Sequence, residues 1–207
     1  MAVGIGSELL GVEPLSDAGR HDDDLMPAID RLTRRHDLDP SSLGRVAVST
    51  GPGGFTGLRV AVATAKAMSL ATGCETVAVP TAMVAARSLG FGVDAVVCLA
   101  SKGTMTHATV VRDGAIVRTP GMIDAQAMAS LIGGGIGLLV GDGHLPAPIR
   151  EAAVAGGASI KAPRLDASAC FQASLGLGAV PAVRLVPIYA REPEAVRIWR
   201  ERRSGGP

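Results

Sequence analysis

The sequence VAVSTGPGGFTGLRVAVATAKAMSLATGCETVAVPT, residues 46–81, decides the fold of this chain. Residues 46–48 have the composition of a short buried strand, and residues 58–71 favour a helix that Gly73 would stop. Residues 76–79 have strand composition again. A strand, a crossover helix and a second strand form a unit whose two strands are parallel. The segment therefore predicts an α/β fold.

The turn before this helix is rich in glycine and has two interpretations. Because the first N–H groups of a helix lack intrahelical partners, the turn could bind phosphate. The interpretation that the sequence favours is a tight structural turn that packs the helix onto the sheet. Leu58 and Arg59 stand where a P-loop needs Lys and Ser or Thr, and the dinucleotide fingerprint lacks its third glycine. The candidate phosphate-binding residues are Gly51, Gly53, Gly54 and Thr56.

The helix predicted at 58–71 is apolar around nearly its whole circumference, so it must be covered on two sides. One side can take the sheet. On another side, small residues at four-residue spacing would let a second helix approach closely, from this chain or from another. A helix predicted at 21–36 has an apolar stripe of its own. Together these faces give the predicted partner interface: Leu25, Ile29, Leu32, Gly57, Ala61, Ala65 and Met68.

The rest of the chain also alternates strands with helices. Apolar runs at 2–5 and 9–12 predict a hairpin, and a helix is expected from 81 to about 88. In the second half we expect strands at 95–100, 106–111, 115–117 and 136–140, and helices at 124–131 and 167–177. Gly90-Phe91-Gly92 is the predicted boundary, which gives one half at 1–90, a second at 91–190 and a basic tail at 191–207.

Composition limits the classes of function. Hydrophobic residues make up 47% of the 207 residues but aromatic residues only 2%, so small aliphatic side chains must build the core. A net charge of +1 gives no electrostatic argument for binding nucleic acid or a membrane. The three cysteines are scattered and form no CxxC pair, which suits a reducing cytoplasm. We also expect no signal peptide and no membrane span, and hence a cytoplasmic protein.

Few residues suit catalysis. None of the four histidines has a second ligand four residues on, and that position after His21 is Leu25, so we predict no metal site. We also find no nucleophile paired with a base. Asp142, between two glycines, could hold a ligand or bond its own backbone. The basic tail is either a solvated helix end or a surface for RNA or an acidic partner; it contains Arg197, Arg200, Arg202 and Arg203.

Four segments resemble the TsaB (YeaZ) family. Residues 49–59, STGPGGFTGLR, with the Ala-rich helix that follows, are similar to that family's GPGSFTGLR signature. Residues 140–143, VGDG, resemble a turn of the same family. Residues 187–191, PIYAR, with Glu194 and Ala195, resemble its PLYLR ending, and residues 21–29 resemble its first helix.

The resemblance implies a fold of the actin, Hsp70 and sugar-kinase kind, with two similar halves. It implies a role in forming N6-threonylcarbamoyladenosine at position 37 of tRNAs that read codons beginning with A. In that family TsaB is a noncatalytic partner that binds its paralogue TsaD through N-terminal helices. TsaD holds the metal and transfers the threonylcarbamoyl group, and TsaE is an ATPase. The resemblance therefore implies no intrinsic cofactor, with ATP or ADP and Mg²⁺ possible at the partner complex, and a homodimer as another possible assembly.

The sequence departs from this family in two places. Family members begin with a strand of the LAIDTS type, and this chain begins after it, which predicts a misassigned start site and two exposed strand edges. The family's DAR-x-G-E-V-Y run is replaced by LASKGTMT at 99–106. The competing hypothesis is a small ATPase or phosphotransferase of the same fold. It would use the Gly51 to Gly57 turn for phosphate, with Asp142 as its remaining candidate for holding Mg²⁺.

Overall fold

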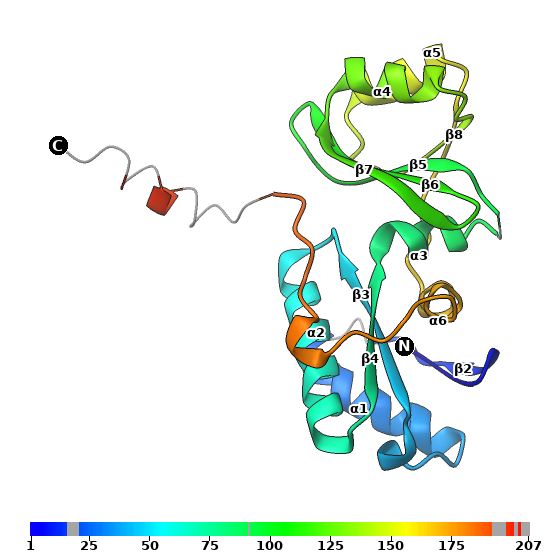
Figure 1. Ribbon diagram of the computed structural model, residues 1–207, viewed down its shortest axis with the longest axis vertical. Coiled ribbons are helices and arrows are strands. Elements are labelled where there is room, and N and C mark those ends of the chain that lie inside the picture. Colours follow the sequence, from blue (N-terminus) through cyan, green and yellow to red (C-terminus); the bar gives the residue numbers. More distant parts are fainter. Residues whose placement is uncertain (16–20, 91, 192–197, 201–202, 204–207) are drawn as a thin grey trace.

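The computed structural model describes residues 1–15, 21–90, 92–191, 198–200 and 203, with residues 21–23 described by their backbone alone. Two lobes lie one above the other in Figure 1. The lower, first lobe contains β1 (Ala2–Ile5), β2 (Glu8–Val12), α1 (His21–Arg35), β3 (Arg45–Gly51), α2 (Phe55–Thr72) and β4 (Glu75–Pro80). The upper, second lobe contains β5 (Ala95–Lys102), β6 (Met105–Arg112), β7 (Ala115–Ile123), α4 (Ala125–Gly133), β8 (Leu138–Gly141), α5 (Ala147–Ala155) and β9 (Ser159–Lys161). A mixed α/β fold is thereby confirmed.

The β3-α2-β4 unit confirms the prediction from the opening segment. β3 and β4 pair in parallel, with Val46 opposite Thr76 and Val48 opposite Ala78. α2 ends at Gly73, which takes the left-handed conformation at φ 76° and donates its N–H to the Ser69 carbonyl. The helix begins at Phe55, three residues earlier than the expected Leu58, so the end of the glycine turn already belongs to the helix.

The first two strands form the expected hairpin, but this hairpin is a sheet of its own. β1 pairs with β2 in antiparallel fashion, and within the described residues neither strand pairs with β3 or β4. Beyond β2, the Glu13 carboxylate forms ion pairs of 2.8 Å with both Arg31 and Arg35 of α1. The described strands of the first lobe therefore form two separate two-stranded sheets.

The second lobe is built on one five-stranded sheet in the order β7-β6-β5-β8-β9. β5, β6 and β7 are antiparallel, and β8 and β9 are parallel to β5. α4 and α5 cover one face, where Met128 and Ile149 pack with Leu139 in a fully buried core. α3 (Thr81–Arg87) covers the other face, where Ala85 packs against Val97.

The sequence missed two elements of this lobe. α5 begins at Pro146-Ala147-Pro148, a pattern that resembles a loop although proline is tolerated in the first turn of a helix. β9 is only three residues long, and two of them, Ser159 and Lys161, are polar, so the sequence shows no apolar run that would indicate a strand. β7 also continues to Ile123, well beyond the predicted end at Val117, since residues 118–121 lack strand composition.

α6 (Ala167–Ser174), near the end of the chain, returns to the first lobe. Ala169 and Ala173 pack with Val77 and Val79 of β4 and Val84 of α3 in one buried cluster. Farther on, the Val180 N–H donates to the Thr76 carbonyl at 2.8 Å beside β4. Residues that follow the second lobe in sequence therefore complete the core of the first lobe, while the predicted division at residue 90 stays a prediction.

Candidate functional site

The glycine turn is closed by the chain's own C-terminal segment. The Ile188 N–H donates to the Thr50 carbonyl at 2.6 Å. Gly51 has φ +107°, and a Cβ at this position would collide with the Ile188 carbonyl oxygen. Glycine is therefore required at 51 for two reasons: its backbone conformation, and the close approach of residue 188.

Three side chains join this turn to the PIYAR segment. The Phe55 and Tyr189 rings lie 4.9 Å apart between centroids, and the Arg59 guanidinium carbon lies 3.7 Å above the centre of the Phe55 ring. The Arg59 Nε also donates to the Tyr189 hydroxyl at 3.2 Å. Two motifs that are 130 residues apart in the sequence thus form one contact. A role of Arg59 in binding an anion would have to compete with both aromatic contacts.

The other phosphate-binding candidates of the turn lie on the surface, where no close contact restricts the residue type. Gly53, Gly54 and Thr56 are exposed, and a Cβ added at Gly54 would meet no atom within 4 Å. Gly54 is the N-cap of α2 and takes extended backbone angles. Asp142 follows β8 in the second lobe, and its Oδ1 accepts the His144 N–H at 2.9 Å. That bond is the backbone turn that the sequence offered as the alternative to a ligand site.

The predicted partner interface is divided between surface and core. Gly57 is exposed, and Leu25, Ile29, Ala61 and Met68 are partly buried. In contrast, Ala65 is 2% exposed and Leu32 4% exposed. These two residues are therefore buried within this chain, and the predicted interface as a whole stays a prediction.

The chain itself covers this side of α2. Ala65 packs with Val48, Val62 and Leu185 in one buried cluster, and the 3-10 helix η2 (Ala182–Arg184) lies just before Leu185. The sequence correctly required a second cover for α2 in addition to the sheet. It missed the source, because residues 178–190 have no regular periodicity that would place them against a helix.

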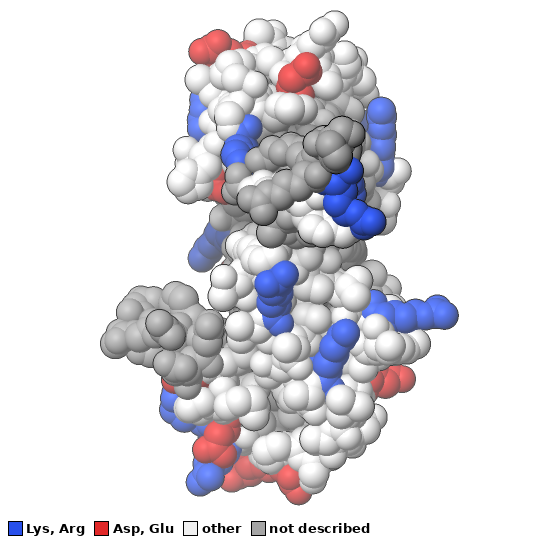
Figure 2. All heavy atoms as spheres, turned by 90° about the vertical axis from the view of Figure 1, so that its left-hand side faces the viewer, with Lys and Arg blue, Asp and Glu red and all other residues white. Residues whose placement is uncertain are grey.

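Another side of α2 remains open, and we call it the α2 outer face: Ala63, Ala67 and Leu70, which lie at i, i+4 and i+7 on one side of the helix. Ala63 and Ala67 are exposed, and Leu70 is 85% exposed. From η2, Val183 is 81% exposed. Figure 2 shows this side as a mostly uncharged surface on which Lys and Arg side chains stand apart.

Burial shifts the pKa of Cys98, Cys170 and His107 in the direction that favours the neutral form. Burial raises the pKa of the Cys98 thiol to about 12 and that of the Cys170 thiol to about 11. Burial also lowers the pKa of His107. In the part of the chain that the structure describes, no three His, Cys, Asp or Glu side chains gather to hold a metal ion, and no helix is both long and apolar enough to cross a bilayer.

Several residues named from the sequence fall outside this description. The side chain of His21 is not described, and neither are Glu194 and Ala195 of the PIYAR ending. Of the basic tail, Arg197 and Arg202 fall outside the described residues. Arg203 is described, and its guanidinium carbon lies 4.6 Å above the Trp199 ring centre. Hence the two alternatives for the tail stay predictions.

Comparisons with solved structures identify the fold. An uncharacterized Pseudomonas aeruginosa protein, described as similar to peptidase YEAZ, shares 18% identity, with a TM-score of 0.61 over 83% of this chain and 84% of its own. YeaZ from Pseudomonas aeruginosa shares 16% identity, with a TM-score of 0.58 over 83% of this chain and 85% of its own. A ROK hexokinase from Thermus thermophilus shares 17% identity over 83% and 91% of the two chains, with a TM-score of 0.42.

The sequence comparison identifies the family. No curated protein matches the chain significantly. Residues 5–176 match the family described as TsaD, tRNA N6-adenosine threonylcarbamoyltransferase. This match spans most of the chain, and it includes both the glycine turn and the second lobe. The chain therefore belongs to the TsaD family and has the fold of YeaZ (TsaB), as the resemblance in its sequence implied.

Proposed function

We propose that this chain is a noncatalytic partner of a TsaD-type threonylcarbamoyltransferase. The complex would form N6-threonylcarbamoyladenosine at position 37 of tRNAs that read codons beginning with A. A TsaE-type ATPase would be the further component, and tRNA would bind through the complex. Any ATP, ADP or Mg²⁺ is proposed to bind at the complex, because no three His, Cys, Asp or Glu side chains gather to hold a metal ion among the residues that the structure describes.

One observation carries the noncatalytic part of this proposal. Ile188 covers the Gly51 end of the turn that could have held phosphate, and Arg59, the cation nearest to the turn in sequence, is stacked on Phe55. A glycine loop that binds phosphate instead leaves its N–H groups and a nearby cation directed at the ligand. The signature in this chain therefore has a structural use, namely fixing the C-terminal segment to the start of α2.

The partner role is supported by the α2 outer face. Leu70 is 85% exposed, and α2 contains two cations, Arg59 and Lys66, and no acidic residue. Helical spacing puts both cations on one side of this apolar row, which fits a partner helix whose small or apolar residues have Asp or Glu beside them. We therefore place the proposed TsaD-type contact on α1 and α2, with the α2 outer face in place of the buried Ala65 and Leu32.

The test is size-exclusion chromatography with light scattering of this chain, alone and mixed with the TsaD-type protein of the same organism. We expect a one-to-one heterodimer, with both chains in one peak at the summed mass. Two separate peaks from folded proteins would contradict the partner role. A chain that self-associates and does not bind the TsaD-type protein would favour the homodimer instead.

A calorimetric titration of the isolated chain with ATP and Mg²⁺ tests the competing phosphotransferase. We expect no saturable binding in the micromolar range. Tight binding that is lost on Thr56→Arg but kept on Leu70→Arg would assign the glycine turn to phosphate and contradict the noncatalytic role.

A further inference from the structure

The C-terminal segment, residues 180–190, is fixed to the first lobe at three points. At its start, the Val180 N–H donates to the Thr76 carbonyl at 2.8 Å, and the Thr76 hydroxyl donates to the Val180 carbonyl at 2.6 Å. In its middle, the fully buried Leu185 packs against α2. Near its end, the Ile188 N–H donates to the Thr50 carbonyl. The segment therefore has a fixed side that faces outward.

The outward side of this segment is aliphatic. We call it the C-terminal strip: Val183, Val186 and Ile188, which are 81%, 57% and 41% exposed. The strip borders the α2 outer face, because η2 contacts α2 and because Arg59, one helical turn before Ala63, donates to Tyr189. Exposed aliphatic side chains that lie together on a fixed backbone mark an interaction surface.

The charges on these two elements have one sign. α2 and residues 175–191 contain no Asp or Glu, and their cations are Arg59, Lys66, Arg184 and Arg191. Among the described residues, none of these four cations takes part in an ion pair, whereas Arg31, Arg35 and Arg45 of the same lobe each have a carboxylate partner at 2.8 Å. The surface formed by α2 and the strip therefore favours a partner that brings negative charge.

The side chains distinguish a protein partner from a nucleic acid. Single-stranded nucleic acids bind to exposed aromatic rings, on which their bases stack. The strip itself is aliphatic. Phe55 and Tyr189, the aromatic residues beside it, already contact each other, and Arg59 lies over the Phe55 ring. An aliphatic row with cations beside it fits a protein whose apolar residues have Asp or Glu beside them.

The backbone of the strip does not suit an added strand. The Leu185 N–H donates to the Ala182 carbonyl at 3.2 Å. The Ile188 N–H is bonded to Thr50, and Pro187 has no N–H. A partner strand needs a row of free donors and acceptors along the edge that it joins. The partner must therefore bind through side chains, as an amphipathic helix does.

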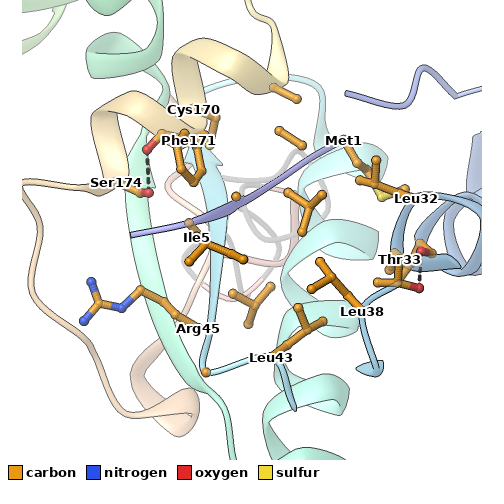
Figure 3. A pocket seen from close by; sticks show the side chains of 18 of the residues that line it. Met1, Ile5, Leu32, Thr33, Leu38, Leu43, Arg45, Cys170, Phe171 and Ser174 are labelled. Carbon is orange, nitrogen blue, oxygen red and sulfur yellow. Dashed lines mark hydrogen bonds between the residues drawn. The ribbon is translucent and has the colours of Figure 1, made fainter. Parts of the chain in front are cut away.

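The apolar hollow of the first lobe has no comparable charges. Its volume is about 670 Å³, and Figure 3 shows Leu38, Leu43 and Phe171 around it, while the Arg45 side chain points away. Arg45 is paired with Glu75 at 2.8 Å. An acidic helix would find no cation without a partner in this lining, so the hollow does not compete with the strip for such a helix.

From these observations we infer that the C-terminal strip and the α2 outer face together bind one acidic amphipathic helix of the TsaD-type partner, and that Arg184 and Lys66 pair with its carboxylates. This inference rests on the proposed function, and it adds residues 183–188 to the contact placed on α1 and α2. The C-terminal segment then has two uses. Its inner side covers α2 within the chain, and its outer side extends the surface for the partner.

The first experiment is isothermal titration of the parent chain and of Val183→Asp with the TsaD-type protein. We expect Val183→Asp to bind at least about tenfold more weakly, because a negative charge replaces an aliphatic contact and repels the acidic helix. The variant should have the same urea unfolding midpoint as the parent, since position 183 is 81% exposed. Val154→Asp on α5, at a position 58% exposed, is the matched control and should bind normally.

The outcomes separate this inference from the proposed function. A parent chain that binds the TsaD-type protein, with unchanged binding by Val183→Asp, would overturn the inference and leave the partner role intact. A folded parent chain that does not bind the TsaD-type protein would overturn both.

The second experiment tests the charge of the partner helix. Arg184→Glu should weaken binding at least about fivefold at about 0.1 M salt, and by a smaller factor at about 0.5 M salt, because salt screens exposed charges. Arg150→Glu on α5 makes the same change of charge at an exposed position of the other lobe and should bind as the parent does. If Arg184→Glu and the parent bind equally well at both salt concentrations, the partner helix is not acidic and the inference fails.

Two further measurements distinguish this occupant from others. We expect no binding of a fluorescent tRNA anticodon-stem oligonucleotide to the isolated chain that depends on Arg184. If Arg184→Glu abolishes such binding but leaves the affinity for the TsaD-type protein unchanged, the strip binds RNA and the inference is overturned. Light scattering should give the same mass for the parent and Val183→Asp. A parent dimer that Val183→Asp converts to a monomer, with unchanged partner binding, would instead assign the strip to a second copy.

Discussion

The backbone N–H of Ile188 donates to the carbonyl of Thr50 at 2.6 Å, which places the end of the chain directly over Gly51. This contact joins a β3 residue to a segment 138 positions later. It explains why the signature at residues 49–59 and the one at residues 187–191 occur together: each provides half of one packed contact.

Gly51→Ala should destabilise the chain by about 2 kcal/mol or more, because a side chain at φ +107° is strained and meets the Ile188 carbonyl. The matched control is Gly57→Ala within α2. A Cβ there meets no atom within 4 Å, so this variant should gain about 0.5–1 kcal/mol. Urea unfolding followed by circular dichroism measures both. Equal free energies of unfolding for the two variants would contradict the proposed role of Gly51.

Tyr189→Ala should release the C-terminal segment from α2, because it removes both the Phe55 ring contact and the hydroxyl that accepts from Arg59. An aromatic pair of this kind contributes about 0.5–1.5 kcal/mol beyond its buried area. We expect faster proteolysis between residues 175 and 190. Tyr189→Phe keeps the ring and should lose less protection, whereas Val183→Ala, at a site 81% exposed, should behave as the parent chain.

Ala67→Arg should weaken the complex with the TsaD-type protein at least about tenfold, because it forces a charge into an apolar contact. The variant should fold normally, since Ala67 is exposed. Val154→Arg on α5, at a position 58% exposed in the other lobe, is the matched control and should bind normally. Ala65→Arg should instead unfold the first lobe. Isothermal titration of each variant with the partner measures the affinity, and unchanged binding by Ala67→Arg would remove the α2 outer face from the interface.

The buried thiols predict a loss of stability at high pH. The unfolded chain releases their protons near the ordinary pKa of 9.0, whereas the folded chain retains them to about 12 at Cys98 and about 11 at Cys170. Their contribution is therefore complete below pH 9 and is lost as the pH rises through the folded values. Between these limits each thiol lowers the free energy of unfolding by at most about 1.4 kcal/mol per pH unit.

The measurement is urea unfolding at pH 8, 9 and 10. The Cys98→Ala, Cys170→Ala double variant should show a flatter dependence on pH than the parent chain. If the slopes are equal, the thiols do not control alkaline stability. At pH 8 both thiols of the folded parent should also react slowly with a thiol reagent, and quickly once urea is added.

The elements with strong local signals could be predicted from the sequence. The hairpin, the β3-α2-β4 unit and the stop at Gly73 follow from periodicity and glycine chemistry, which act within a few neighbours. α5 could not be predicted because its first turn holds Pro148, and β9 because a three-residue strand shows too little alternation. These elements owe their conformation to packing in the second lobe.

The candidate site was only partly predictable for a related reason. The sequence identified Gly51 to Gly57 and the PIYAR segment as two motifs, but gave no sign that Tyr189 and Arg59 touch. The small-residue row of α2 was recognised as a face that must be covered. Its cover is Leu185, whose position depends on a long-range path of the chain. Spacing within a helix cannot distinguish an internal cover from a partner.

The return of α6 and Leu185 to the first lobe also sets the order in which the protein can fold during synthesis. Ala169, Ala173 and Leu185 are core residues of the first lobe, yet the ribosome makes them after the whole second lobe. Domains generally fold in the order in which they emerge. Here the second lobe can complete its folding first, while α2 and β4 still have an apolar side exposed to solvent. The nascent chain is therefore most prone to aggregation, and most in need of a chaperone, until Leu185 has left the exit tunnel.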